Sequence, residues 1–387
     1  MAMAQSRKRP HAAVAEDVEL ERSLLKSGLG GAACGVDSGG VPVIDMSQGD
    51  DACAAAMWEA ATGVGFFTVT NHGIDEALID RAFGAAASFF AQPVADKETQ
   101  SPFAREMNSG FEYMAQVRPS TGLADRKESL QITARAGAME GRWPASPGDF
   151  EGTAKELMAK AHALGCRVLS LLEPRACPTL SRGTLAKSHQ LWAPDGQCTL
   201  RLLHYMPTDK AALAALQASG RQHWRAGPHT DWCCCTLLFQ RPGNEGLECA
   251  SNPRAGSTRW TAVDPVPGGI AVNVGDMLAR WSDNRLLSNL HRVRLPTPAE
   301  CDPPKPRYSM AFFLQADKHC MLESETYEPI TAGDYLLGRI RSNFADSAAA
   351  VANQADGAAA GAAEGAAPAE GADLRRRRRW MSGSKFA

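Results

Sequence analysis

The chain has 387 residues, of which 44% are hydrophobic, and its formal net charge is −2 at pH 7. This nearly neutral charge gives no general electrostatic reason to expect nucleic acid or a membrane as a partner, and no apolar run reaches the ~20 residues that span a bilayer. The 11 cysteines include no Cys-x-x-Cys pair. They favour reduced thiols in a cytoplasmic protein over a disulfide framework.

The two ends of the chain differ in composition from the middle. Residues 1–38 are rich in alanine and glycine and carry the basic cluster Arg7-Lys8-Arg9, with no apolar stretch behind it that would make a secretory signal. Residues 346–387 are Ala/Gly-rich and then Arg-rich, and such a composition buries too little apolar surface to offset the entropy of ordering. We predict a flexible N-terminal extension and a disordered C-terminal tail, with nuclear import as the alternative interpretation of the basic runs.

Residues 39–345 are interpreted as one domain, with a mixed helical and strand part at 39–180 and a strand-rich core at 195–316. Apolar alternation, helical spacing and Gly/Pro punctuation predict its elements, and Asp75 is expected to cap the second helix. We expect strands at 41–45, 64–70, 200–205, 236–240, 270–277 and 310–314, and helices at 51–63, 75–90 and 152–172.

The stretch Pro228-His229-Thr230-Asp231-Trp232 stands at the head of one predicted strand. Side chains at i and i+2 of a strand leave the same face, so His229 and Asp231 can point at one common atom. An imidazole and a carboxylate aimed at one point indicate a divalent metal. A lone His-x-Asp pair is more often structural, so the metal interpretation needs a third ligand from a distant strand.

His291 is the candidate for that third ligand, and it is followed by Arg307 and Ser309 just ahead of the apolar run at 310–314. Two histidines and one carboxylate, with coordination positions left open, are the facial arrangement of non-haem Fe(II) oxygenases. An arginine with a hydroxyl two residues on offers a bidentate fork and one more donor, which suits a carboxylate. The combination is far more specific than any of its members.

The series His229-x-Asp231, His291 and Arg307-x-Ser309 resembles the Fe(II)/2-oxoglutarate-dependent dioxygenase superfamily. The surrounding sequence is similar to the isopenicillin N synthase-like branch, and the resemblance covers roughly residues 40 to 345. It is carried by the segments Val41-Pro42-Val43-Ile44-Asp45, Gly65-Phe66-Phe67-Thr68-Val69-Thr70-Asn71-His72-Gly73, Leu200-Arg201-Leu202-Leu203-His204-Tyr205, Gly246-Leu247-Glu248 and Val272-Asn273-Val274-Gly275-Asp276-Met277.

The resemblance implies a mainly β fold with flanking helices around a distorted jelly-roll, or double-stranded β-helix, core. It also implies an oxidoreductase that uses Fe(II), 2-oxoglutarate and dioxygen to oxidise a small organic metabolite, most simply by hydroxylation, with release of succinate and carbon dioxide. We expect this small-molecule enzyme to be a monomer.

The resemblance assigns the site residues as well. His229, Asp231 and His291 would hold the iron, with no catalytic residue beyond these ligands. Arg307 and Ser309 would bind the far carboxylate of 2-oxoglutarate, together with Tyr205. Tyr113 and Gln131 are the candidates for substrate contact.

Four alternatives stay open at this point. The oxidation can be desaturation or ring closure, or the chain can be an iron oxidase of the isopenicillin N synthase type that uses no 2-oxoglutarate. Two histidines and a carboxylate also bind zinc in hydrolases, and a vestigial site would leave a non-catalytic binding protein. Of the other polar residues, His72 and His223 are not expected to be ligands, and Cys233-Cys234-Cys235 is interpreted as a run of small buried side chains.

Overall fold

The computed structural model describes residues 36–37, 40–116, 123–220, 222–251 and 259–341. The predicted extensions at 1–38 and 346–387 therefore lie outside the described residues, apart from the pair 36–37. None of the helices in the described ranges is long and apolar enough to cross a membrane.

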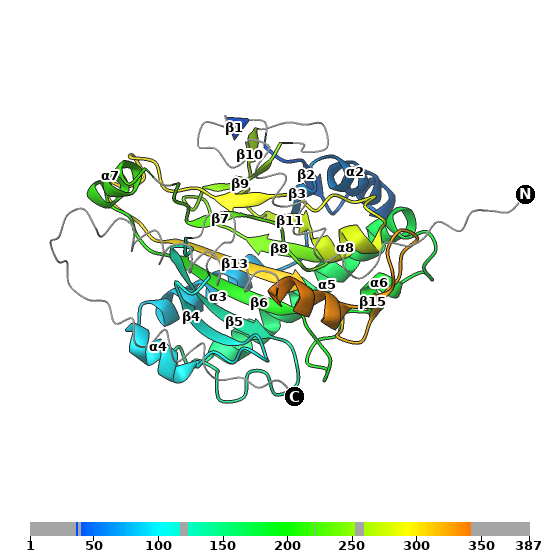
Figure 1. Cartoon of the computed structure of the whole chain (residues 1–387), viewed down its shortest axis with the longest axis horizontal. Coiled ribbons are helices and arrows are strands. Elements are labelled where there is room, and N and C mark those ends of the chain that lie inside the picture. Colours follow the sequence, from blue (N-terminus) through cyan, green and yellow to red (C-terminus); the bar gives the residue numbers. More distant parts are fainter. Residues whose placement is uncertain (1–35, 38–39, 117–122, 221, 252–258, 342–387) are drawn as a thin grey trace, which may run out of the picture.

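Two β-sheets form the centre of the described fold (Figure 1). The larger sheet has, in spatial order, β2 (Val43–Asp45), β3 (Phe66–Thr70), β11 (Ile270–Val274), β8 (Cys235–Phe239), β13 (Arg307–Leu314), β6 (Thr199–Tyr205), β5 (Lys127–Thr133) and β4 (Gly110–Tyr113). The smaller sheet has β1 (Val36–Asp37), β10 (Trp260–Ala262), β9 (Leu247–Ala250), β12 (His291–Val293) and β7 (Ala226–His229). A separate short pair joins β14 (Met321–Leu322) to β15 (Ile330–Thr331).

Most neighbouring strands in these sheets are antiparallel, whereas β2–β3 and β1–β10 are parallel pairs. An apolar cluster that draws side chains from both sheets, including Leu203, Ala311, Leu247 and Val293, fills the space between them. The predicted jelly-roll core is confirmed.

Helices cover the outer face of the larger sheet, where the main apolar core lies. The helices α2 (Asp50–Gly63), α3 (Glu76–Phe90) and α5 (Phe150–Ala176) carry most of this packing. The other helices of the described ranges are α4 (Val94–Gln100), α6 (Thr184–Lys187), α7 (Lys210–Ala218) and α8 (Asp276–Trp281). Along α5, Leu157, Ala161, Leu164 and Val168 are buried at helical spacing, and each large apolar side chain contributes about 1.5–3 kcal/mol. At Gly165 the helix comes so close to Leu314 of β13 that a Cβ would clash with it.

A buried ion network also joins α4 to the outer face of the larger sheet. Lys97 Nζ lies 2.7 Å from Glu128 Oε2 and donates a second bond of 2.9 Å to the carbonyl of Phe90. The other carboxylate oxygen of Glu128 lies 2.6 Å from His204 Nδ1, and Tyr308 stacks on the imidazole of His204. Because these charges are paired and hydrogen-bonded, their burial is tolerated.

The predicted elements agree with the structure where the local signal is strong. Asp75 caps α3 by accepting a bond of 3.0 Å from the backbone N–H of Ala77. The strand predicted at 270–277 is wrong at its end, because β11 stops at Val274 and α8 begins at Asp276. Gly275 forms the corner between them, so the polypeptide turns away from the sheet there.

Candidate metal centre

Three side chains meet between the two sheets at the edge strand of the smaller one. His229 ends β7 and His291 begins β12, and their rings face each other in register with centroids 4.3 Å apart. Pro228 is tolerated in β7 because β7 is an edge strand, and a residue whose N–H would point away from the sheet has no strand partner to donate to. The carboxylate Oδ1 of Asp231 lies 3.5 Å from His291 Nε2 and 3.9 Å from His229 Nε2.

The prediction that His229 and Asp231 share one face of a strand is wrong in its geometry. The strand ends at His229, and Asp231 lies in the connection to β8. A backbone hydrogen bond fixes this connection, because the N–H of Asp276 donates a bond of 2.7 Å to the carbonyl of Asp231. Gly275 permits this close approach, since a Cβ there would collide with the carbonyl oxygen of Cys233.

Each histidine is oriented by a backbone carbonyl. His229 Nδ1 lies 2.7 Å from the oxygen of Gly227, and His291 Nδ1 lies 3.3 Å from the oxygen of Asn289. A carbonyl can only accept, so Nδ1 carries the proton and Nε2 keeps its lone pair. Both Nε2 atoms therefore face Asp231 as ready metal ligands, and the carbonyls are the kind of outer partner that fixes ligating histidines.

Asp231 is oriented by two side chains that the sequence reasoning did not single out. Its Oδ2 accepts bonds of 2.7 Å from the hydroxyl of Thr236 and 2.9 Å from Asn273 Nδ2, which leaves Oδ1 for the histidines. Burial raises the pKa of this carboxyl, but the charges that His291 and His229 carry when they are protonated, together with the bond from Asn273, outweigh it and hold the pKa well below its usual range. A polar residue inside the apolar run of β11 was the available signal for Asn273.

One ligand atom from each of the three side chains lies within 4.8 Å of the others, so the three side chains can hold one metal ion. A metal bonded at about 2.1 Å to each ligand allows donor separations up to about 4.2 Å, and the two measured distances to Asp231 Oδ1 are 3.5 and 3.9 Å. Among the described residues no other group of histidine, cysteine, aspartate or glutamate comes close enough to hold a metal. Two imidazoles and one carboxylate leave positions open for other ligands, as in non-haem Fe(II) sites.

Arg307 lies at the start of β13, opposite Tyr205 in the sheet register, and is 2% exposed. Its Nε donates to the carbonyl of Asn244 at 2.9 Å, Nη1 to Ser309 Oγ at 3.2 Å and Nη2 to Gln240 Oε1 at 3.0 Å. The guanidinium carbon is 4.9 Å from the ring centroid of Tyr205. Burial lowers the pKa of Arg307 and interaction with Tyr205 raises it, with a net decrease. All of these contacts are with neutral groups.

The two substrate candidates lie on different faces of the larger sheet. Gln131 is buried on β5, on the face that is directed between the sheets. It accepts a bond of 2.8 Å from Arg201 Nε and donates one of 2.9 Å to Asn108 Oδ1. Tyr113 is 45% exposed and is in register with Glu128 of the outer face, so the structure does not bring it to the metal centre.

Two other histidines and the three consecutive cysteines lie outside the metal centre, as the sequence predicts. His72 Nδ1 accepts a bond of 3.1 Å from the backbone N–H of Ile74 in a turn, and His223 contacts Ser219 Oγ at 2.9 Å away from the metal ligands. Cys233, Cys234 and Cys235 are all buried, and burial foremost raises the pKa of each of these thiols.

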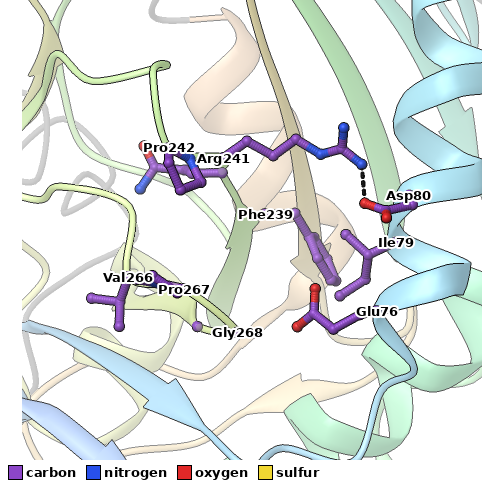
Figure 2. Close-up of a pocket in the computed structure, with 11 residues that line it drawn as sticks. Glu76, Ile79, Asp80, Phe239, Arg241, Pro242, Val266, Pro267 and Gly268 are labelled. Atoms are coloured by element: carbon purple, nitrogen blue, oxygen red, sulfur yellow. Dashed lines mark hydrogen bonds and ion pairs between the residues drawn. The ribbon is translucent and has the colours of Figure 1, made fainter.

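A hollow of about 320 Å³ lies elsewhere, where the end of β8 meets the start of α3 (Figure 2). Glu76, Asp80, Phe239 and Arg241 are among its lining residues, and Figure 2 shows Arg241 reaching across to pair with Asp80. No residue of the metal centre lines it. Gln240, which accepts a bond from Arg307 Nη2, also lines the hollow, so the hollow adjoins a residue that positions Arg307 but contains no metal ligand.

Two family models match successive parts of the chain. Residues 41–146 match the N-terminal region of the non-haem dioxygenase in morphine synthesis, and residues 197–316 match the 2OG-Fe(II) oxygenase superfamily. The second match contains the two histidines, the aspartate, Arg307 and Ser309.

Similar proteins come from fungi and plants. The chain is 30% identical over 339 residues to the 2-oxoglutarate-Fe(II) type oxidoreductase hxnY of Emericella nidulans, which covers 78% of this chain and 90% of the relative. It is 29% identical over 317 residues to gibberellin 2-beta-dioxygenase 5 of Oryza sativa subsp. japonica, which covers 78% and 84%.

Crystal structures show the same fold. A full-length protein of Neurospora crassa, crystallised in complex with alpha-KG and thymine, is similar with a TM-score of 0.64 and 26% identity, over 80% of this chain and 99% of that chain. A 2OG-Fe(II) oxygenase family protein from Caulobacter crescentus is similar with a TM-score of 0.65 and 27% identity, over 79% and 99%.

Proposed function

This chain belongs to the 2OG-Fe(II) oxygenase superfamily, and on that premise we propose that it hydroxylates a small organic metabolite. It is an oxidoreductase that depends on Fe(II) and 2-oxoglutarate. In the proposed reaction 2-oxoglutarate is oxidised to succinate and carbon dioxide, while one atom of dioxygen enters succinate and the other becomes the hydroxyl oxygen of the product. The bound iron supplies this oxidising chemistry.

His229, Asp231 and His291 are the proposed iron ligands. The observation that carries the proposal is their orientation: both imidazole Nε2 atoms face one carboxylate oxygen, Oδ1 of Asp231. Backbone carbonyls fix the two rings, and Thr236 with Asn273 fixes the carboxylate. Ligands held in place before the metal arrives lose little conformational freedom when it binds.

Arg307 is the proposed anchor for the far carboxylate of 2-oxoglutarate, with Ser309 and Tyr205 beside it. Support comes from its burial among neutral acceptors without a carboxylate partner in the described residues, since a buried guanidinium charge is costly unless an anion pairs with it. Asn244 and Gln240 hold the fork in place and leave N–H groups for a ligand.

Gln131 and Arg201 are the proposed polar contacts for the substrate. They lie on the inner face of the larger sheet, hydrogen-bonded to each other, and the Arg201 guanidinium carbon is 5.8 Å from the ring centroid of Phe313. An amide, a guanidinium and an aromatic ring together suit a small planar molecule with several hydrogen-bonding atoms. The thymine complex of the Neurospora crassa protein supports heterocycles of that kind as the first compounds to test.

The test begins without oxygen. Fe(II) and then 2-oxoglutarate are added to the purified protein while the visible spectrum is recorded. We expect a weak charge-transfer band only when both are present, and its loss in Asp231→Ala would assign it to this centre. Candidate heterocycles are then added with isotopically labelled dioxygen, and both succinate release and product mass are followed.

Hydroxylation requires one labelled oxygen atom in the product for each succinate formed. A product that has lost two hydrogens without gaining oxygen would contradict hydroxylation and indicate desaturation or ring closure. A band that persists in Asp231→Ala would contradict the proposed ligand set.

A further inference from the structure

A second arginine, Arg225, is buried without a carboxylate partner in the described part of the chain. Arg225 directly precedes β7 and is 7% exposed. Its Nε is fully buried and has no hydrogen-bond partner within the described ranges. Burying an arginine with an unpaired N–H group costs folding free energy. The proposed function gives this side chain no role.

The backbone places Arg225 at the end of the sandwich where Arg307 lies. The carbonyl of Arg225 accepts a bond of 3.1 Å from the N–H of Arg126. The next residue, Lys127, is in register with Tyr205 on β6, and Tyr205 is in register with Arg307 on β13. Through Arg126 and its neighbour Lys127, the backbone of Arg225 is therefore connected to the paired residues Tyr205 and Arg307 of the larger sheet.

The charges around Arg225 agree with this placement. Burial lowers the pKa of Arg225 to about 10, and the positive charge of Arg307 is the next largest cause, while Tyr205 and Glu300 act in the opposite direction. The side chain is thus protonated at neutral pH, and its strongest charged neighbour is another cation.

Neighbouring cations have their own carboxylates. Lys127 Nζ lies 2.7 Å from Asp125 Oδ2, and Arg294 forms two bonds of 2.7 and 2.9 Å with Glu300. No such ion pair forms at Arg225 within the described part of the chain. Two like charges buried side by side are unfavourable unless an anion neutralises them.

We propose that Arg225 is a second guanidinium for the far carboxylate of 2-oxoglutarate, so that Arg225 and Arg307 bind it from two sides. Three N–H bonds of Arg307 are already made within the protein, whereas a carboxylate offers about four acceptor positions. Arg225 supplies the missing donors and positions the cosubstrate. This inference rests on the proposed role of Arg307.

The test compares two ligands of equal chain length: 2-oxoglutarate and 2-oxopentanoate, in which a methyl group replaces the far carboxylate. Their dissociation constants are measured by anaerobic titration of the Fe(II)-loaded protein, with the charge-transfer band as the readout. The variants are Arg225→Gln, Arg225→Lys and, as the matched control, the double variant R294Q/E300Q, which removes a nearby guanidinium together with its partner.

In Arg225→Gln we expect 2-oxoglutarate to bind at least ten-fold more weakly, equivalent to about 1.4 kcal/mol, and 2-oxopentanoate to bind as in the unaltered protein. Arg225→Lys should lose less, because it keeps the charge without the fork. The ligand-free Arg225→Gln protein should melt no lower than the unaltered one, since the substitution removes an uncompensated buried charge. The control should bind both ligands normally.

Three results would overturn the inference: 2-oxoglutarate affinity within two-fold of the original in Arg225→Gln, equal weakening of both ligands, or a lower melting temperature of the ligand-free variant. A different failure would concern Arg307. If the unaltered protein did not prefer 2-oxoglutarate to 2-oxopentanoate, the proposed carboxylate anchor itself would be wrong.

Discussion

The hydroxyl of Thr236 offers a sharp test of how the metal centre is prepared. Thr236→Val removes one of the two donors on Asp231 Oδ2, the bond of 2.7 Å, and leaves only Asn273 at 2.9 Å. A hydrogen bond to an ionised group contributes about 1.5–3 kcal/mol, which corresponds to roughly 10- to 150-fold in affinity. Loss of a comparable outer partner costs about 10- to 100-fold in metal affinity at other sites. We therefore expect Fe(II) to bind about 10- to 100-fold more weakly.

The assay is anaerobic Fe(II) titration of the two proteins, with calorimetry as the readout. Thr68→Val is the matched control, because Thr68 is similarly buried on β3 of the same sheet and forms no bond with Asp231. It should change the affinity by less than two-fold. An unchanged Fe(II) affinity in Thr236→Val would refute the reasoning that this hydroxyl orients the carboxylate.

Three further predictions concern stability, measured by urea unfolding of the metal-free protein. Gly275→Ala forces a methyl group onto the carbonyl oxygen of Cys233; since a backbone atom cannot rotate away, we expect a loss of about 1–3 kcal/mol. Lys97→Met leaves a buried carboxylate without its cation, and we expect a loss of about 3–5 kcal/mol with unchanged Fe(II) affinity, because the pair lies on the outer face of the larger sheet. The hydrogen bond from Arg294 lowers the pKa of Glu300 to about 2. A lowered carboxyl pKa contributes stability above the unfolded value of about 4.3 and loses it as the pH falls through about 2, so the stability difference between Glu300→Gln and the original protein should fade over that interval.

Control variants separate these specific losses of stability from the effect of making a substitution at all. Gly148→Ala adds a methyl group in open space and should be nearly neutral. Lys210→Met breaks an exposed pair with Asp302 and should cost at most about 1 kcal/mol. The steric argument is contradicted if Gly275→Ala unfolds with the same free energy as Gly148→Ala. The ion-pair argument is contradicted if Lys97→Met loses no more unfolding free energy than Lys210→Met. The pKa argument is contradicted if the stability difference between Glu300→Gln and the original protein grows below pH 4.

Local signals in the sequence were sufficient for elements that depend on near neighbours. The spacing of Leu157, Ala161, Leu164 and Val168 predicts a helix, and the structure has α5 there, extended by a few residues at each end. The cap at Asp75 is equally local. Residue types alone also pointed to His229, Asp231 and His291, because few side chains can hold iron.

The arrangement of the site depended on contacts between segments far apart in the chain. Periodicity placed Asp231 on a strand, but Gly275 and the N–H of Asp276, more than forty residues away, hold it in a connection instead. No local pattern could show that β7 and β12 pair with His229 opposite His291. Strand register is set by which faces become buried when sheets pack together, so a sequence pattern cannot fix it.

The faces of β4 and β5 and the surroundings of Arg225 also depend on the tertiary structure. The sequence offered Tyr113 and Gln131 as equals, and only the sheet register separates the inner face from the outer one. No sequence pattern showed that Arg225 would be buried with the charge of Arg307 acting on it. The sequence determined which chemical groups and which local elements this protein has. The tertiary structure decided which groups face each other, because burial and electrostatic pairing are properties of neighbours in space.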